Sequence, residues 1–252
     1  MIGIGITTRN RSEVLAWSLK HFKAFEPELP YTLVIVDDNS DDNQRVSNQE
    51  HCEGYQYIYN EERKGIAGSK NVCLKNLQSA DHVFLFDDDC FPQCSKWDIP
   101  FRQLLELGIE HSSHCLELPK EHGQQISDPV GELKDASSFF SVSMSQGMCL
   151  YFSRRCLDSI GLYDEKYGIY GFEHSDMSLR ARKLGFCGNQ KYEYIVPKES
   201  IKYLFSLDFD HGWFHRETLF GKIPFLFTTS LAGENVDSYV KISGQHFSSK
   251  KH

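Results

Sequence analysis

The segment HVFLFDDDCFP, residues 82–92, joins an apolar run to three adjacent carboxylates. Its first half lacks the alternation of polar and apolar residues that marks a half-exposed strand, and such a continuous run is typical of a parallel strand buried on both faces. The segment YTLVIVDD, residues 31–38, has the same character and also ends in aspartates. Both segments therefore predict central strands of a parallel sheet, each with carboxylates at its carboxyl end.

Strand and helix patterns alternate around these two segments. MIGIGITT, residues 1–8, predicts a first strand, and the apolar spacing after Ser12 predicts a helix. GYQYIYN, residues 54–60, predicts another strand, and GIAGSKNVCLKNLQSA, residues 65–80, becomes helical after its glycines. This order predicts an α/β fold that is Rossmann-like, with a mostly parallel central sheet flanked by helices.

The pattern weakens in the second half of the chain. Residues 111–138 are polar and irregular, so His111, His114 and His122 are expected in a surface loop. FFSVSMSQGMCLYFSRRCL, residues 139–157, predicts two strands and the start of a helix, and a further helix is expected from about Glu173.

Composition excludes several classes of protein. The chain has 252 residues, of which 40% are hydrophobic and 25% charged, as in ordinary globular domains. Its net charge of −8 gives no overall attraction to nucleic acid or to anionic membranes. No signal peptide or transmembrane segment is recognisable, and the eight scattered cysteines are expected to be reduced thiols, so a cytoplasmic protein is expected.

Polar residues follow three of the predicted strands. Thr7, Thr8 and Arg9 lie where the first strand ends, residues 37–39 lie where the second ends, and residues 87–89 lie where the strand within residues 82–92 ends. Ligands of open α/β sheets bind beyond the carboxyl ends of the strands, so these residues predict a binding site at one sheet edge.

The three adjacent aspartates, residues 87–89, bring negative charges close together, and the repulsion among them must be offset. Two unit charges about 4 Å apart repel by about 4 kcal/mol at an effective dielectric constant near 20. The cluster is therefore either a solvated acidic turn or a site for Mg²⁺ or Mn²⁺, ions that combine one or two carboxylates with substrate phosphates. The chain has no GxxxxGK[ST] loop and no GxGxxG pattern, which argues against a P-loop NTPase and a dinucleotide dehydrogenase.

Five segments in chain order, which together span residues 2–186, form a recognisable set. The segments are IGITTRNRSEVLAWSLKHF, LVIVDDNSDD, GIAGSKNVCL, VFLFDDDCFP and SRRCLDSIGLYDEKYGIYGFEHSDMSLRARKLGF. Taken in this order, they resemble the family 2 inverting glycosyltransferases, which have the GT-A fold. The fourth resembles the Asp-x-Asp metal motif of that family, and the fifth resembles its acceptor-side block.

The resemblance implies a single GT-A domain over residues 1–252. Residues 1–100 would form the nucleotide-sugar-binding half, residues 101–215 the acceptor and catalytic half, and residues 216–252 a C-terminal segment. It implies a metal-dependent transfer, with inversion, from a nucleotide-diphosphate sugar, most simply a UDP-sugar. The acceptor stays open among a saccharide, a lipid-linked sugar, a protein and a modified nucleic acid.

The resemblance also assigns roles to residues of the donor half. Thr7 and Arg9 would line the nucleotide pocket. Asp38, with Asp37, would bind the base, and Lys70 and Asn71 would approach the base or the diphosphate, although the family usually has arginine at the position of Lys70. Asp87 and Asp88 would reach the ribose and metal-bound water. Asp89, with Asp87, would bind Mn²⁺ or Mg²⁺, and His211 or His215 would supply a further ligand.

The segment GFEHSD departs from the family pattern, in which an aspartate is the general base. His174 occupies that position here, between Glu173 and Asp176. Either His174 or Glu173 could be the base, with Asp176 orienting His174, or both could lack a catalytic role. Asp176 and Arg180 are also spaced for an ordinary helical ion pair.

Two functions from other classes remain open. A non-catalytic nucleotide-sugar-binding module would keep the pocket without the base. A nucleotidyltransferase should carry a glycine-rich loop after the first strand, and ITTRNRSEV contains no glycine.

Overall fold

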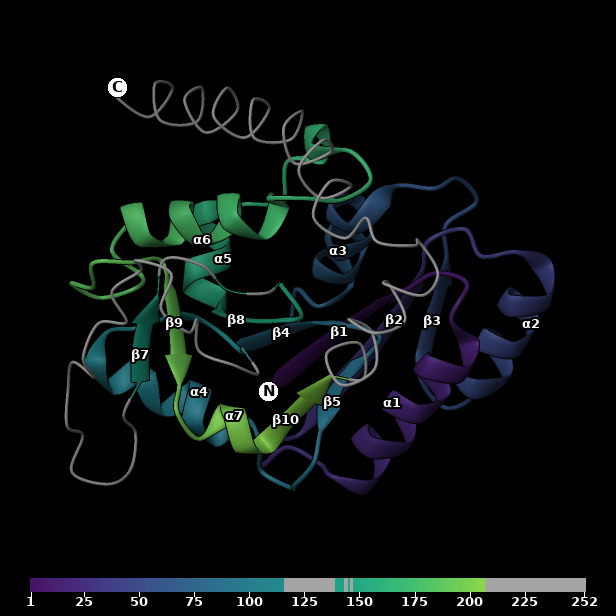
Figure 1. Cartoon of the computed structure of the whole chain (residues 1–252), viewed down its shortest axis with the longest axis horizontal. Coiled ribbons are helices and arrows are strands. Elements are labelled where there is room, and N and C mark those ends of the chain that lie inside the picture. The colour runs from purple at the N-terminus through teal and green to yellow at the C-terminus, as the bar shows by residue number, and fades with distance from the viewer. Residues whose placement is uncertain (116–138, 143–144, 146, 207–252) are drawn as a thin grey trace, which may run out of the picture.

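A computed structural model describes residues 1–115, 139–142, 145 and 147–206, and all structural statements below concern these residues. A six-stranded sheet with the order β3-β2-β1-β4-β8-β6 forms the centre (Figure 1). Strands β1 to β4 are parallel, and β8 runs antiparallel to both of its neighbours. The expected mostly parallel α/β sheet is confirmed. The strands of this sheet are β1 (Ile2–Thr8), β2 (Tyr31–Asp37), β3 (Gln56–Tyr59), β4 (His82–Asp87), β6 (His111–Ser113) and β8 (Cys149–Ser153).

Helices cover both faces of this sheet, and two short ribbons lie beside it. The ribbons pair β5 (Cys90–Pro92) with β10 (Leu204–Ser206) and β7 (Phe139–Val142) with β9 (Tyr194–Pro197). The helices are α1 (Ser12–Ala24), α2 (Asp42–His51), α3 (Gly65–Asn76), α4 (Ile99–Gln103), η1 (Leu104–Leu107), α5 (Arg154–Ile160), η2 (Glu165–Tyr167), α6 (Glu173–Lys183) and α7 (Ser200–Tyr203).

Two apolar cores follow from the continuous apolar runs of the central strands. One core packs residues of α3, α5 and α6 on the sheet face that lies uppermost in Figure 1. The other packs α1 and α4 against the opposite face and includes an aromatic group in which Phe84 lies 4.9 Å from Trp97. Among the described residues, no helix is long and apolar enough to cross a membrane.

Helix α3 lies very close to β1, because β1 carries glycine where α3 crosses it. A Cβ atom at Gly5 would lie 2.7 Å from Cys73 Cβ of α3, and one at Gly3 would lie 2.8 Å from Ala80 Cβ, in the segment that follows α3. These approaches are shorter than any side chain at either position would allow. The two glycines therefore set how α3, and the polar residues at its N-terminus, stand over the sheet.

The expectation that His111 and His114 lie in a surface loop is wrong. His111 begins β6, and both side chains have no exposed surface. The His111 ring stacks on Phe152 and donates from Nδ1 to the Tyr151 carbonyl at 2.9 Å, while Nε2 lies 2.8 Å from Ser178 Oγ. Burial lowers the pKa of His111 to about 4, so the ring is neutral. His122 lies outside the described residues.

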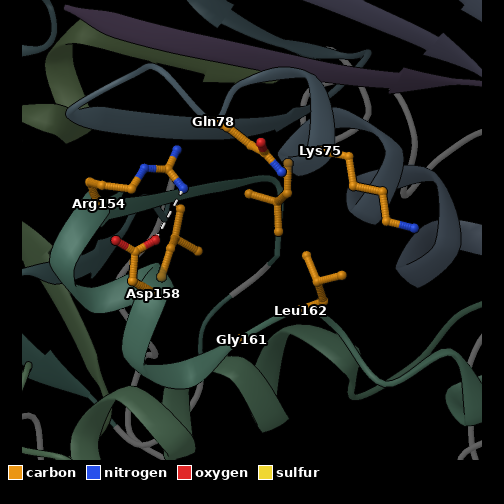
Figure 2. Close-up of a pocket in the computed structure, with 8 residues that line it drawn as sticks. Lys75, Gln78, Arg154, Asp158, Gly161 and Leu162 are labelled. Carbon is orange, nitrogen blue, oxygen red and sulfur yellow. Dashed lines mark ion pairs between the residues drawn. The ribbon is translucent and has the colours of Figure 1, made fainter.

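A groove of 600 Å³ lies between α3 on one side and α5 with the loop that follows it on the other (Figure 2). Leu74 and Leu157 contribute apolar surface, and the Arg154–Asp158 ion pair also lines the groove. Ser153, next to Arg154, pairs with His82 at the start of β4. The groove is therefore at the amino end of β4, away from the aspartates at its carboxyl end.

Candidate active site

The carboxyl ends of three parallel strands meet at one sheet edge. Thr7 of β1 stands opposite Asp87 of β4 on one side and next to the end of β2 on the other, and Thr8 stands opposite Asp37. The Asp87 N–H donates to the Met148 carbonyl at 2.9 Å, which brings the start of β8 to the same edge. The predicted gathering of polar residues after the strands is confirmed.

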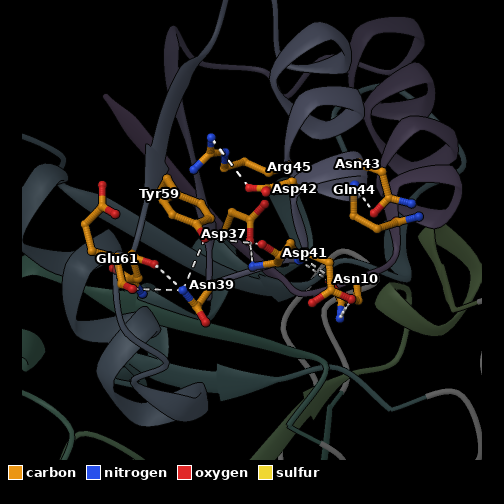
Figure 3. Close-up of polar contacts among 12 residues, drawn as sticks. Asn10, Asp37, Asn39, Asp41, Asp42, Asn43, Gln44, Arg45, Tyr59 and Glu61 are labelled. Atoms are coloured by element: carbon orange, nitrogen blue, oxygen red, sulfur yellow. Dashed lines mark hydrogen bonds and ion pairs between the residues drawn. The ribbon is translucent and has the colours of Figure 1, made fainter.

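Asp37 is fully buried and holds the turn that follows β2 (Figure 3). Its carboxylate accepts hydrogen bonds from the Ser40 N–H at 2.9 Å, the Asn48 amide at 2.7 Å and the Tyr57 hydroxyl at 2.8 Å. In the same turn Asn39 has a φ of 63° and donates to the Glu61 carbonyl. The contacts of Asp37 thus fix the loops between β2, α2 and β3.

Asp38 binds the N-terminus of α3. One carboxylate oxygen accepts from the Lys64 N–H at 2.7 Å and the Asn60 amide at 3.1 Å, and the other accepts from the Gly65 N–H at 2.9 Å. An anion at this position satisfies N–H groups that the helix itself leaves unpaired. Asp38 therefore joins the end of β2 to the helix that carries Lys70 and Asn71.

Thr8, not Thr7, is the threonine that contacts the aspartate cluster. Thr8 Oγ1 donates to Asp88 Oδ2 at 2.7 Å, and Arg11 pairs with Asp88 at 3.1 Å. Arg9 is half-buried, and its Nε is a buried donor that finds no hydrogen-bond partner among the described residues. An unpaired buried donor at this edge is a point at which an anionic ligand can be bound.

The three aspartates differ in exposure and in partners. The Asp87 side chain is 36% exposed and pairs with Lys70, whereas Asp88 and Asp89 are buried. Burial raises the pKa of Asp88 to about 7, against the opposing effects of Arg11 and Thr8. Asp89 accepts a hydrogen bond from Ser206 Oγ. Lys70 and Arg11 thus supply counter-charges within the protein, so the repulsion within the cluster does not by itself require a metal ion.

Lys70 is buried between the two halves of the site. Its ammonium group lies 3.0 Å from Asp87 Oδ1 and 3.2 Å from the Gly147 carbonyl. Burial alone would lower the pKa of Lys70, but Asp87, Tyr163 and Glu173 outweigh it and raise the pKa above its ordinary value. Lys70 therefore stays positively charged and neutralises Asp87 from the buried side of the site.

Asn71 binds the acceptor-side block directly. Its amide donates to the Tyr163 carbonyl at 3.0 Å and to Glu165 Oε1 at 2.9 Å, and its Oδ1 accepts from the Tyr163 N–H at 2.8 Å. Next to this contact, the Ile66 N–H donates to the Ile169 carbonyl at 2.9 Å. The N-terminal half of α3 thus holds the loop that leads to α6.

Glu173 and His174 start α6 at the same edge of the sheet. Glu173 Oε2 accepts from the Gly171 N–H at 2.7 Å, and Oε1 lies 3.5 Å from His174 Nδ1. Burial alone would raise the pKa of Glu173, but His174 and Lys70 outweigh it and lower the pKa to about 2. A Cβ atom at Gly147 would lie 2.9 Å from the His174 ring, so glycine there leaves space for the imidazole.

Asp176 and Arg180 form a buried ion pair within α6. Arg180 donates to Asp176 Oδ2 from Nε at 2.9 Å, and also to the carbonyls of Ile160 and Leu162. The pair therefore anchors the segment after α5 to α6, as the helical spacing of the two residues allowed.

Some of the predicted residues cannot be placed. His211 and His215 lie outside the described residues. Within the described part of the chain, no group of three or more His, Cys, Asp or Glu side chains is arranged to hold a metal ion. The carboxylate oxygens of Asp87 and Asp89 nevertheless suit Mg²⁺ or Mn²⁺, ions that complete their coordination with water and phosphate oxygens.

Sequence reasoning missed four residues of this site. Arg11, Gly147, Tyr163 and Ser206 contact or surround the predicted groups, yet none was assigned a role. The run RNR after the first strand signalled cationic partners for the aspartates. The other three residues come close to the site only through tertiary contacts.

Comparison with known proteins agrees with this architecture. Residues 4–97 match the model of Glycosyl transferase family 2. An uncharacterized glycosyltransferase, R363 of Acanthamoeba polyphaga mimivirus, is 26% identical over 199 residues, which cover 72% of this chain and 73% of the relative. These matches support a glycosyltransferase.

Two solved structures show the same fold at low sequence identity. The mannosyltransferase PcManGT of Pyrobaculum calidifontis, in complex with GDP-Man and Mn²⁺, superposes with a TM-score of 0.55 and 17% identity, over 78% of this chain and 54% of that one. GalNAc-T7, with UDP, GalNAc and Mn²⁺, superposes with a TM-score of 0.58 and 14% identity, over 71% and 40%. This chain thus spans about half or less of either enzyme. The fold is that of the GT-A glycosyltransferases.

Proposed function

We propose that the chain is a metal-dependent glycosyltransferase that moves a sugar from a UDP-sugar to an acceptor hydroxyl, with inversion at the anomeric carbon. One observation carries the proposal: Lys70 contacts both Asp87, in the donor half, and the carbonyl of Gly147, the glycine that packs against the His174 ring of the acceptor half. Residues 1–100 would bind the nucleotide sugar, residues 101–215 would bind the acceptor, and residues 216–252 would follow as a C-terminal segment.

The donor would lie over the carboxyl ends of β1, β2 and β4. Asp87 and Asp89 would hold Mn²⁺ or Mg²⁺, with His211 or His215 as a further ligand, and the ion would neutralise the departing diphosphate. Thr7 would line the pocket, and the unpaired Nε of Arg9 would bind an anionic oxygen of the donor. Asp38 would accept from the base, and Asp88 would reach the ribose. Three buried residues would hold these groups in place through the contacts described above, namely Asp37, Lys70 and Asn71.

His174 is the better candidate for the general base. A carboxylate with a pKa of about 2 is a weak base near neutral pH, and both oxygens of Glu173 already have partners. Glu173 at His174 Nδ1 would leave Nε2 to take the proton of the acceptor hydroxyl. The oxygen would then attack the anomeric carbon opposite the diphosphate, and the C–O bond to the diphosphate would break. Asp176 would act through Arg180 to hold α6 in place.

Release of nucleoside diphosphate tests the proposal. UDP-sugars and GDP-sugars are incubated with the chain, with and without Mn²⁺, and free UDP, GDP and pyrophosphate are measured. We expect metal-dependent UDP release, lost in Asp89→Ala and kept in Asp158→Ala, whose carboxylate is exposed and far from the site. Unchanged turnover in Asp89→Ala contradicts the metal assignment.

Two parallel measurements separate the alternatives. Nucleotide-sugar binding without release indicates a binding module, and release of pyrophosphate when a nucleoside triphosphate and a sugar phosphate replace the nucleotide sugar indicates a nucleotidyltransferase. His174→Ala should abolish transfer, while Glu173→Gln should lower it. A larger loss of transfer in Glu173→Gln than in His174→Ala would make Glu173 the base.

A further inference from the structure

Tyr163 carries a buried hydroxyl without a hydrogen-bond partner among the described residues. The side chain is 3% exposed, and its backbone N–H and carbonyl are both bound to Asn71. Because the ring is enclosed by its neighbours, it has little room to turn its hydroxyl elsewhere. A buried hydroxyl that lacks a partner destabilises a fold, and phenylalanine would fill the same space without that cost.

The hydroxyl lies within the electrostatic reach of the site. After burial, the groups that act most strongly on Tyr163 are Lys70, Glu173 and Asp87. Burial raises the pKa of Tyr163 above its ordinary value, so the phenol keeps its proton and can donate it in a hydrogen bond. Tyr163 is thus a donor among charged groups that the proposed reaction uses.

Glu173 and Lys70 both have capacity for such a partner. A carboxylate has about four acceptor positions, and Glu173 uses two, for Gly171 and His174. An ammonium group has three donors, and Lys70 directs two of them to Asp87 and Gly147 within the described part of the chain. An unpaired hydroxyl, an unsaturated carboxylate and an unused N–H therefore share one buried region.

We propose that Tyr163 is a positioning residue for the transfer reaction, and that its hydroxyl donates to Glu173 in the substrate-bound enzyme. Together with the remaining N–H of Lys70, this bond fixes the carboxylate against His174 Nδ1 and so orients the imidazole toward the acceptor hydroxyl. This inference rests on the proposed function. It adds a residue that acts through Glu173 and does not touch the substrate.

The test compares Tyr163→Phe with Tyr151→Phe. Tyr151 also carries a buried hydroxyl, but that hydroxyl lies 3.0 Å from His82 Nδ1, at the opposite end of β4 from the aspartates. We expect Tyr163→Phe to lower kcat about tenfold, to leave KM for the UDP-sugar unchanged and not to lower Tm. Tyr151→Phe should show the converse, with unchanged kcat and a lowered Tm.

A double variant shows whether Tyr163 acts through Glu173. In the Glu173→Gln background, Tyr163→Phe should lower kcat by less than about twofold, because the group on which it acts is already altered. Three results overturn the assignment: full kcat in Tyr163→Phe, a loss of kcat that accompanies a lower Tm, or a full additional loss in the double variant. If the wild type is active and any of these three results is found, only the assignment of Tyr163 is refuted. A wild type that neither binds nor cleaves a nucleotide sugar refutes this assignment and the proposed function together.

Discussion

Lys70 Nζ lies 3.0 Å from Asp87 Oδ1, and the lysine is 1% exposed while the aspartate side chain is 36% exposed. A buried cation on α3 is therefore in contact with a carboxylate that is still partly exposed to solvent. The pair places one end of the aspartate cluster at a fixed point between α3, β4 and Gly147.

Replacing Lys70 with methionine should destabilise the chain moderately. Methionine fills most of the same volume, and Asp87 can be solvated once its partner is lost, so the cost should be about 1–2 kcal/mol, below the 3–5 kcal/mol for a fully buried pair. Urea unfolding measures the change. Lys202→Met removes the exposed pair with Glu199 at 3.3 Å and should cost less than about 0.5 kcal/mol. Equal losses of unfolding free energy in the two variants would show that the Lys70–Asp87 pair stabilises the chain no more than an exposed pair does.

Glu173→Gln should destabilise the chain in a pH-dependent manner. Because the pKa of Glu173 is lowered from 4.5 to about 2, the ionised group stabilises the fold above pH 4.5, and this contribution is lost as the pH falls toward 2. At pH 7 the variant should be less stable by up to about 3 kcal/mol. Urea unfolding at pH 7, 5 and 3.5 should show the difference between variant and wild type narrowing below pH 4.5. A difference that does not change with pH would show that Glu173 is not ionised in the way described.

Gly147→Ala should displace the His174 ring. The new methyl group would lie 2.9 Å from Cγ of the imidazole and 3.0 Å from Nδ1, so the ring must move from the position in which Nδ1 lies 3.5 Å from Glu173 Oε1. We expect transfer activity to fall about tenfold or more, with a stability loss of about 1–3 kcal/mol. In a His174→Ala background most of that stability loss should disappear, as thermal unfolding can show. If the loss persists, the strain lies in the backbone and not in the ring.

Arg180→Met should be among the most destabilising single changes in α6. It removes the Arg180 ion pair from Asp176, which is 1% exposed, and the Arg180 hydrogen bonds from the carbonyls of Ile160 and Leu162. The expected cost is about 3–5 kcal/mol in urea unfolding. Arg45→Met, which removes an exposed pair with Asp42 at 3.8 Å, should cost less than about 1 kcal/mol. A small effect of Arg180→Met would mean that the pair is solvated.

The donor half could be predicted because its signals are local. Continuous apolar runs such as residues 83–86 are typical of buried strands, and parallel strands bring the residues that follow them to one edge. The positions of Asp38 and Asp87 followed from this rule alone. The burial of His111 could not be predicted, because an edge strand of polar composition is buried only when a partner strand and a helix from later in the chain cover it.

The sequence alone determined the α/β class of this protein, the order of its first four strands with the helices that follow the first and third of them, and the sheet edge at which carboxylates would gather, because strand periodicity and the end of an apolar run are properties of neighbouring residues. Only the tertiary structure decided which charges neutralise one another. Lys70 meets Asp87, Arg11 meets Asp88, and Tyr163 comes to lie among Lys70, Asp87 and Glu173 across long sequence separations. Electrostatic energies depend on distance and burial in space, and neither quantity can be read from the spacing of residues along the chain.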